Sequence, residues 1–117
     1  MLIRNYLNTP LRDEVVHEGE GFCKHCTVFY DKEIDAPIRF INYTIIPPNA
    51  SFGLHKHGLD NEFYVVLSGE GIYYQNDEEQ PVRKGDIMMN ALNGTHGLRN
   101  TGSEEMELLV FECAMER

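Results

Sequence analysis

The feature that most constrains the fold is a series of short runs rich in β-branched and aromatic residues, each bounded by turn-forming residues. These runs span residues 26–30, 38–46, 62–67, 71–75, 86–92, 95–100 and 106–115. The segments between them, such as PPNAS, SGEG and NTGSEE, contain the Gly, Pro, Asn and Ser that favour turns. Strands at spacings of roughly eight to twelve residues are typical of an all-β sandwich or barrel.

The chain is 117 residues long, which is enough for one domain with one core. We therefore expect residues 1–117 to form a single β-barrel domain. In the run EFYVVL, Glu62 and Tyr64 share one face and the opposite face is also apolar. One face must fill an interior and the other must pack against a further layer, which suits an antiparallel double-sheet barrel.

Two segments predict something other than a strand. TPLRDEVV has helical character, with Thr9 as a cap and Pro10 at the first helical position, and predicts a short helix. NDEEQ, residues 76–80, predicts a solvated hairpin tip within the turn-rich stretch up to Asp86.

The charge balance indicates which partners to expect. Ten Lys and Arg stand against nineteen Asp and Glu, a net charge of −9, and no basic stripe is present. Binding to nucleic acid or to anionic membranes depends on Lys and Arg contacts, so we expect neither partner. The start lacks the apolar core of a signal peptide and no run is long enough to cross a bilayer, so we expect a cytoplasmic protein.

The three cysteines favour reduced thiols, because their number is odd. CKHC at 23–26 is typical of zinc or redox sites, but no second ligand pair of comparable spacing exists. In a strand, Cys23 and His25 would share one face and Cys26 would take the other, so these side chains would not converge on one ion. We interpret Cys23 and Cys26 as small apolar strand residues.

Two histidines a single residue apart, His55 and His57, precede a turn-rich step and an apolar strand that opens with Glu62. Side chains two apart in a strand share a face, with Cα atoms about 7 Å apart, so both imidazoles can reach one ion. Glu62 would face the other way if the strand ran straight. Gly58 and residues 60–61 tolerate a bend, so the chain can bring Glu62 back towards the histidines.

A fourth ligand is available in GTHGLRN, where His96 lies in another expected strand. Neutral imidazole is the commonest protein metal ligand. Three imidazoles with one carboxylate suit divalent iron, manganese, nickel, cobalt, copper or zinc. The sequence therefore predicts a transition-metal site whose ion is held by His55, His57, Glu62 and His96.

The same residues carry a resemblance to a known family. The segment resembles the first motif of the cupin superfamily, G-x5-H-x-H-x3,4-E-x6-G, with His55, His57, Glu62 and Gly69 at the family's spacing. Asn49 stands where this motif has its leading Gly. That departure falls at a turn and puts the local loop shape in question more than the metal site.

The second cupin motif, G-x5-P-x-G-x2-H-x3-N, is matched by Gly85, His96 and Asn100. Ala91 stands where the motif has Pro, and Asn93 where it has Gly. Both departures are again at turn positions. Two separate matches in the right order make the resemblance specific.

The resemblance implies a small jelly-roll barrel with the metal inside near one mouth. It implies that His55, His57, Glu62 and His96 are the ligands, with one or two positions left to water or substrate. It also implies a homodimer, in which the N-terminal residues, about 1–30, form an arm that packs on the partner subunit.

Other residues are candidates for the same site. Tyr64 shares the face of Glu62 and is expected either to line the cavity and orient a ligand or to pack in the interior. His17 and His25 could reach a pocket, although exposed histidine is the ordinary case. Met88 and Met89 are expected in the core or the pocket wall, because a thioether prefers softer ions than this donor set suits.

The fold leaves several functions open. One hypothesis is a metal-dependent enzyme acting on a small oxygenated molecule such as a sugar, hydroxy acid or enolisable compound. Dioxygenases, isomerases, epimerases, decarboxylases and lyases all share the cupin fold, and the sequence identifies no general acid or base. The alternatives are a non-catalytic module that binds or senses such a molecule, and a closed structural metal site.

Overall fold

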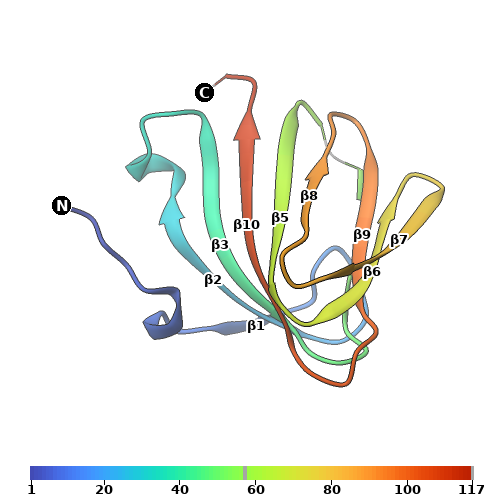
Figure 1. Ribbon diagram of the computed structural model, residues 1–117. Coiled ribbons are helices and arrows are strands. Elements are labelled where there is room, and N and C mark those ends of the chain that lie inside the picture. The colour runs from blue at the N-terminus through green and yellow to red at the C-terminus, as the bar shows by residue number, and fades with distance from the viewer. Residues whose placement is uncertain (57, 117) are drawn as a thin grey trace.

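The computed structural model describes residues 1–56 and 58–116, so the predictions that involve His57 lie outside the described residues. The chain forms two antiparallel sheets (Figure 1). The six-stranded sheet has the order β1-β2-β3-β10-β5-β8, with bounds Arg12–Glu14, Cys23–Tyr30, Ile38–Ile46, Met106–Ala114, Asp60–Ser68 and Ile87–Asn90. The four-stranded sheet has the order β4-β9-β6-β7, with bounds Ser51–Lys56, Thr95–Asn100, Glu70–Gln75 and Glu78–Arg83.

The predicted all-β, double-sheet architecture is confirmed. The two sheets face each other as a jelly-roll sandwich and are not closed into a continuous barrel. The helices among the described residues are two single 3-10 turns, Tyr6–Asn8 and Asp31–Glu33. Neither of these described turns has the length or apolar character to cross a membrane.

The predicted strands at 38–46 and 95–100 have the bounds of β3 and β9, and the other predicted strands differ from the observed ones only at their ends. The helix expected around Thr9 and Pro10 is wrong. Residues 12–14 instead form β1, because their backbone pairs with β2, with Arg12 opposite His25. The expected hairpin tip at 76–80 is also partly wrong, because pairing with β6 makes Glu78–Arg83 a strand, β7.

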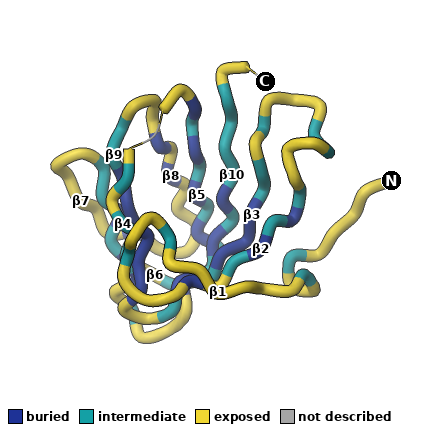
Figure 2. Tube along the Cα trace, turned by 180° about the vertical axis from the view of Figure 1, so that it is seen from behind, coloured by how far each residue is buried: buried dark blue, intermediate teal, exposed yellow. Residues whose placement is uncertain are grey.

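The core lies between the two sheets, and Figure 2 shows buried segments on strands of both sheets. It contains Ile46, Tyr64, Val66, Leu98, Met106 and Leu108, each at most 2% exposed. A smaller apolar cluster, centred on Cys26, Val28 and Tyr43, lies on the outer face of the six-stranded sheet. Cys23 belongs to the interior and Cys26 to the outer cluster, so the strand alternation expected for CKHC is confirmed.

Two of the positions that depart from the cupin motifs keep the backbone conformation that a glycine would allow. Asn49 has φ of 68° and Asn93 has φ of 58°, both in the left-handed region. Asn tolerates this region better than other residues with a side chain. The loop geometry is therefore retained at these two turns despite the changed residues.

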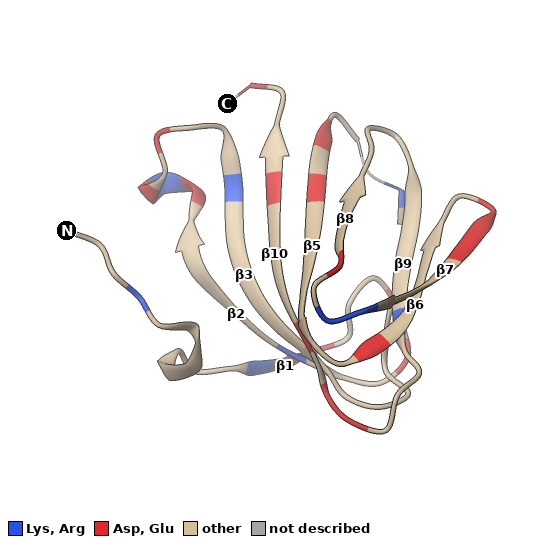
Figure 3. Cartoon of the chain, viewed as in Figure 1, with Lys and Arg blue, Asp and Glu red and all other residues tan. Residues whose placement is uncertain are grey.

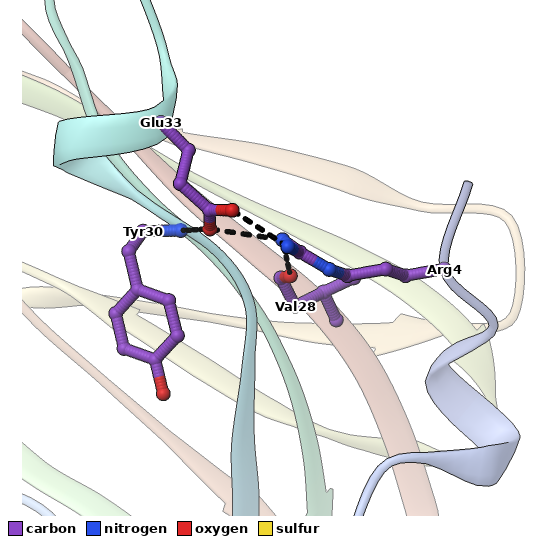
Figure 4. Close-up of polar contacts among 4 residues, drawn as sticks. All are labelled: Arg4, Val28, Tyr30 and Glu33. Carbon is purple, nitrogen blue, oxygen red and sulfur yellow. Dashed lines mark hydrogen bonds and ion pairs between the residues drawn. The ribbon is translucent and has the colours of Figure 1, made fainter. Parts of the chain in front are cut away.

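The N-terminal arm is held to the six-stranded sheet by one arginine (Figure 4). Arg4 donates two hydrogen bonds to the Glu33 carboxylate, at 2.8 and 2.6 Å, and one to the backbone oxygen of Val28, at 2.9 Å. This bidentate contact lowers the pKa of Glu33 to about 2, chiefly through the hydrogen bond from Arg4. Tyr6 packs further along the arm against Tyr43, with ring centroids 4.4 Å apart.

Candidate metal centre and adjoining cavity

Two histidines from neighbouring strands form the first part of the site. His55 in β4 lies opposite His96 in β9, and their ring centroids are 4.3 Å apart. Between the pairs Phe52–Leu98 and His55–His96, β4 advances by three residues while β9 advances by two, which is a β-bulge. The extra residue keeps both Phe52 and His55 on the inner face, where strict alternation would have turned one of them outward.

The hydrogen bond of His55 determines which ring nitrogen can bind a metal. Its Nδ1 lies 2.9 Å from the backbone oxygen of Gly53. A carbonyl only accepts hydrogen bonds, so Nδ1 carries the hydrogen and Nε2 carries the lone pair of the neutral ring. This arrangement is common for metal-binding histidines, whose second nitrogen is oriented by a backbone or carboxylate acceptor.

Glu62 approaches the two histidines from the opposite sheet. The chain leaves the four-stranded sheet after β4 and enters the six-stranded sheet with β5, so Glu62 faces back across the interior. Its Oε1 lies 3.4 Å from Nε2 of His96 and 3.9 Å from Nε2 of His55. The predicted return of Glu62 towards His55 is confirmed, and it results from this change of sheet.

The three side chains together have the spacing of a metal-binding group. One ligand atom from each of His55, Glu62 and His96 lies within 4.8 Å of the others. His96 is fully buried and Glu62 is 6% exposed, so the group is shielded from solvent. A carboxylate and two imidazoles held in a buried position fit a divalent transition metal, because the ion's charge would compensate the burial of the carboxylate.

A tyrosine adjoins the carboxylate. Tyr64 is 1% exposed, and its pKa is raised well above the usual value by burial, by the charge of Glu62 and by a hydrogen bond with Glu62. Tyr64 is therefore a neutral hydroxyl that donates to the carboxylate. Deeper in the interior, the Tyr73 hydroxyl donates to Oδ1 of Asn90, which is opposite Glu62 in the sheet register.

A cavity of about 150 Å³ adjoins Glu62 and extends over the inner face of the six-stranded sheet. Glu62 and Tyr64 from β5 form one wall, and His25, Asn42 and Thr44 from β2 and β3 form the opposite wall. The remaining lining residues are Glu14, Val16, His17, Phe40, Phe52 and Val110. The cavity thus connects the candidate metal centre with strands that come much earlier in the chain.

The segment after β1 closes one side of this cavity. Gly53 donates a backbone hydrogen bond to Val16, at 3.0 Å, and Ser51 donates one to Glu20, at 2.9 Å. These bonds tie the segment from the six-stranded sheet to β4 of the four-stranded sheet. A side chain at Gly53 would collide with the backbone oxygen of His17, so only glycine allows this close approach. The His17 ring stacks on His55, with centroids 3.5 Å apart.

The wall opposite Glu62 is polar. Nδ1 of His25 lies 2.9 Å from the Thr44 hydroxyl, and its Nε2 lies 3.8 Å from a carboxylate oxygen of Glu14. Burial, together with the charge of Arg12, lowers the pKa of His25, so the ring is neutral at neutral pH. Asn42 is 9% exposed, and its amide oxygen accepts no hydrogen bond within the described part of the chain.

The structure brings together most of the residues singled out in the sequence. His55, Glu62 and His96 converge, Tyr64 lines the adjoining cavity, and His17 and His25 line it as well. Met88 is buried in the core, whereas Met89 is 57% exposed on the outer face, so the expectation for Met89 is wrong. The alternation of IMMN in β8 turns Met89 away from the interior.

Sequence reasoning missed the polar wall. Asn42 and Thr44 are two residues apart in the run IRFINYTII, so they share a face, and in the structure this face is the inner one. Polar residues on an inward face are an available signal for a binding site. Glu14 was missed because its segment was interpreted as helical.

The comparisons with known proteins agree with this architecture. A family model described as a cupin domain matches residues 42–112. The chain is 29% identical over 110 residues to an oxalate-binding protein of Thermotoga maritima, covering 94% of this chain and 91% of that protein.

Solved structures are also similar. A crystal structure of a predicted oxalate decarboxylase from Thermotoga maritima has a TM-score of 0.93 and 25% identity, and the match covers 98% of this chain and 100% of that chain. A cupin domain from Schizosaccharomyces pombe has a TM-score of 0.79 at 12% identity, covering 94% of this chain and 72% of that chain. At 12% identity, the similarity to the Schizosaccharomyces pombe domain shows only a shared fold.

Proposed function

This chain belongs to the cupin domain family, and from that premise we propose that it is a metal-dependent enzyme acting on a small oxygenated organic molecule. Sugars, hydroxy acids and enolisable compounds are the substrate classes whose oxygens chelate such an ion. The observation that carries the proposal is the convergence of His55, Glu62 and His96 within 4.8 Å beside a cavity.

In this proposal His55, His57, Glu62 and His96 hold the ion. Support comes from the donor set, from the hydrogen bond that presents Nε2 of His55, and from the burial of Glu62 and His96. Iron, manganese, nickel, cobalt, copper and zinc all suit three imidazoles and a carboxylate. When bound, such an ion would polarise the oxygens of a chelated molecule.

The residues around the cavity would then bind and orient that molecule. The Tyr64 hydroxyl orients Glu62 through their hydrogen bond. His17 lines the same cavity and stacks on His55. His25, neutral and close to Thr44 and Glu14, is the candidate for holding or accepting a proton at the far wall.

Metal content tests the site directly. Protein purified without chelator or nickel resin is expected to contain about one transition-metal ion per chain by elemental analysis. His96→Ala is expected to lose the ion, because it removes a buried ligand. His25→Ala is the matched control and is expected to retain the ion, since His25 lies across the cavity. Equal metal in the wild-type protein and His96→Ala would defeat the proposed site.

The second candidate function is a non-catalytic module that binds or senses the same kind of molecule. It is favoured by the likeness to a protein named for binding oxalate, over nearly the whole chain. Incubation of the metal-loaded protein with a bound ligand, followed by nuclear magnetic resonance of that ligand, separates the two. Chemical change of the ligand supports the enzyme, whereas quantitative recovery of unchanged ligand supports the binding module.

We also propose that the protein is a homodimer that uses the outer face of its six-stranded sheet. Phe63 and Phe111 stack there with ring centroids 5.0 Å apart, and the neighbouring Ile87 and Met89 are 65% and 57% exposed. A second copy would bury this apolar face and the exposed N-terminal arm. Light scattering should give the dimer mass, and Met89→Glu should shift it towards the monomer. A monomeric wild-type protein would exclude this arrangement.

The remaining expectations stay predictions. They are a cytoplasmic location, the lack of nucleic-acid or membrane partners, and the extent of a single domain over residues 1–117. Basic residues are spread over several strands and loops in Figure 3 and do not gather into one continuous face. This distribution supports the expectation that the protein does not bind nucleic acid.

A further inference from the structure

The cavity beside the candidate metal centre has two chemically different ends. The metal end carries Glu62 and Tyr64 from β5, with His17 stacked over His55. The far end carries Asn42 and Thr44 from β3 together with His25 from β2. A cavity of about 150 Å³ has roughly the volume of five water molecules. A molecule chelated at the metal end therefore has room to extend to the far end.

The far end offers hydrogen-bonding groups and no positive side chain. Of the described residues that line the cavity, none is Lys or Arg, and two, Glu14 and Glu62, are carboxylates. Arg12 pairs with His25 in the strand register but is exposed and does not line the cavity. A negative group placed at the far end would therefore face the Glu14 carboxylate, with no Lys or Arg among the described lining residues to offset the repulsion.

Asn42 indicates the kind of group that fits at this end. Its side chain lines the cavity and is nine-tenths buried, and its amide oxygen accepts no hydrogen bond from the described residues. Such a buried polar group is costly unless a ligand or ordered water completes its hydrogen bonds. The Thr44 hydroxyl, paired with Nδ1 of His25, offers a second position that can both donate and accept. An uncharged hydroxyl matches both partners.

We infer that His25, Asn42 and Thr44 form a specificity pocket that selects a ligand with chelating oxygens at one end and an uncharged hydroxyl at the other. The substrate class is a hydroxylated monocarboxylic acid or a related polyol, in preference to a bare dicarboxylate such as oxalate. This inference rests on the proposed function, because the chelating end of the ligand is placed at the proposed metal.

A matched series of three α-hydroxy acids tests the pocket. Lactate, glycerate and tartronate share the same chelating end and differ at the other, which is a methyl, a hydroxymethyl and a carboxylate group. Calorimetry with the metal-loaded protein is expected to show that glycerate binds at least tenfold more tightly than tartronate or oxalate, and more tightly than lactate. Tartronate or oxalate binding as tightly as glycerate would overturn the inference.

Two variants locate the preference. Asn42→Leu and Thr44→Val remove the polar groups at similar size, and each is expected to reduce the preference for glycerate over lactate severalfold while lactate binding stays unchanged. Thr27→Val is the matched control, since Thr27 pairs with Asn42 in the register but does not line the cavity. Equal weakening of all three acids in Asn42→Leu would indicate a structural effect and would overturn the assignment.

The metal content of each sample separates this inference from the proposed function. Wild-type protein that takes up no ion in the presence of added manganese, iron or zinc contradicts the proposed function, and the inference with it. Wild-type protein that holds the ion but binds none of the acids, or prefers the dicarboxylates, contradicts the inference alone. Retained metal in Asn42→Leu, with correct folding by circular dichroism, makes the comparison of ligands valid.

Discussion

The interior of this protein has two regions that share strands but differ in chemistry. Three strands each supply both polar and apolar inward residues, among them His96 and Leu98 in β9, Glu62 and Val66 in β5, and Asn42 and Ile46 in β3. All six are at most 9% exposed. Burial alone therefore does not separate the region that stabilises the fold from the region that forms the candidate site.

The difference between the two regions lies in what each side chain needs once it is buried. Leu98, Val66 and Ile46 are stabilised simply by removal from water and by close packing. Buried imidazole, carboxylate and amide groups lose hydration and require specific partners in return. The apolar region therefore supplies stability, whereas the polar region is expected to cost stability unless its buried groups find partners, as they would in the proposed site. Figure 3 shows acidic segments side by side on β5 and β10, where Glu62 is opposite Glu112.

The largest expected effect on stability comes from the apolar region. Leu98→Ala should lower the free energy of unfolding by about 2–5 kcal/mol, because it leaves a cavity in a fully packed site. His96→Ala, two residues away on the same face, should cost the metal-free protein less, since a buried polar group is removed. Urea unfolding of both variants measures this difference. A metal-free His96→Ala that is destabilised as much as Leu98→Ala would break the comparison.

Removal of the metal should have the next largest effect. An ion present at a hundredfold excess over its dissociation constant stabilises the folded state by about 2.7 kcal/mol. Chelation should therefore lower the unfolding free energy of the wild-type protein and of Leu98→Ala by the same amount. His96→Ala should show no change. Thermal unfolding with and without chelator measures these increments, and a response in His96→Ala would place the ion elsewhere.

A smaller effect is expected when one hydroxyl is removed. Tyr64→Phe deletes the hydrogen bond to Glu62, which should weaken metal affinity about tenfold and cost about 1 kcal/mol in stability. Tyr43→Phe is the matched control, because the Tyr43 hydroxyl donates to Glu107 on the outer side of the sheet. Metal titration of the two variants should separate them. Equal metal affinity in Tyr64→Phe and wild type would remove Tyr64 from the site.

The smallest effect is expected at the exposed arm. The pKa of Glu33 is lowered to about 2 from its ordinary value of 4.5, chiefly by the hydrogen bond from Arg4. A carboxyl whose pKa is depressed in the folded state stabilises the protein above the ordinary value, and this contribution is lost as the pH falls from 4.5 towards 2. Arg4→Gln should therefore be slightly less stable than wild type at neutral pH, and the difference should shrink towards pH 2, where the hydrogen bond from Arg4 to the Val28 oxygen does not depend on Glu33. A difference as large at pH 2 as at neutral pH would exclude the ion pair as its cause.

Much of the architecture could be predicted from local patterns. The alternation of side chains and the turn residues predicted the first and last residues of β3 and β9 correctly. The motif spacing identified three side chains that converge. β1 and β7 were not predicted, because Arg12–Glu14 and Glu78–Arg83 are polar and become strands only through pairing with β2 and β6. The formation of such edge strands depends more on pairing with a neighbouring strand than on the β-propensity of their own residues.

The candidate site was predictable only in part. His55, Glu62 and His96 carry recognisable spacing, whereas Asn42, Thr44 and Glu14 do not. The bulge in β4 also could not be inferred, since it is defined by the residues of β9 opposite it. Each missed feature involves partners that are far apart along the chain.

By itself, the order of residues determined the class of fold, the identity of the candidate ligands and the acidic character of the protein. Alternation, turn preference and ligand spacing act over a few residues, and so they can be deduced from the chain alone. Only the tertiary structure decided that Glu62 faces the histidines from the opposite sheet, and that β2 and β3 supply the far wall of the cavity. Those features arise from long-range pairing, whose geometry is determined when the two sheets pack together.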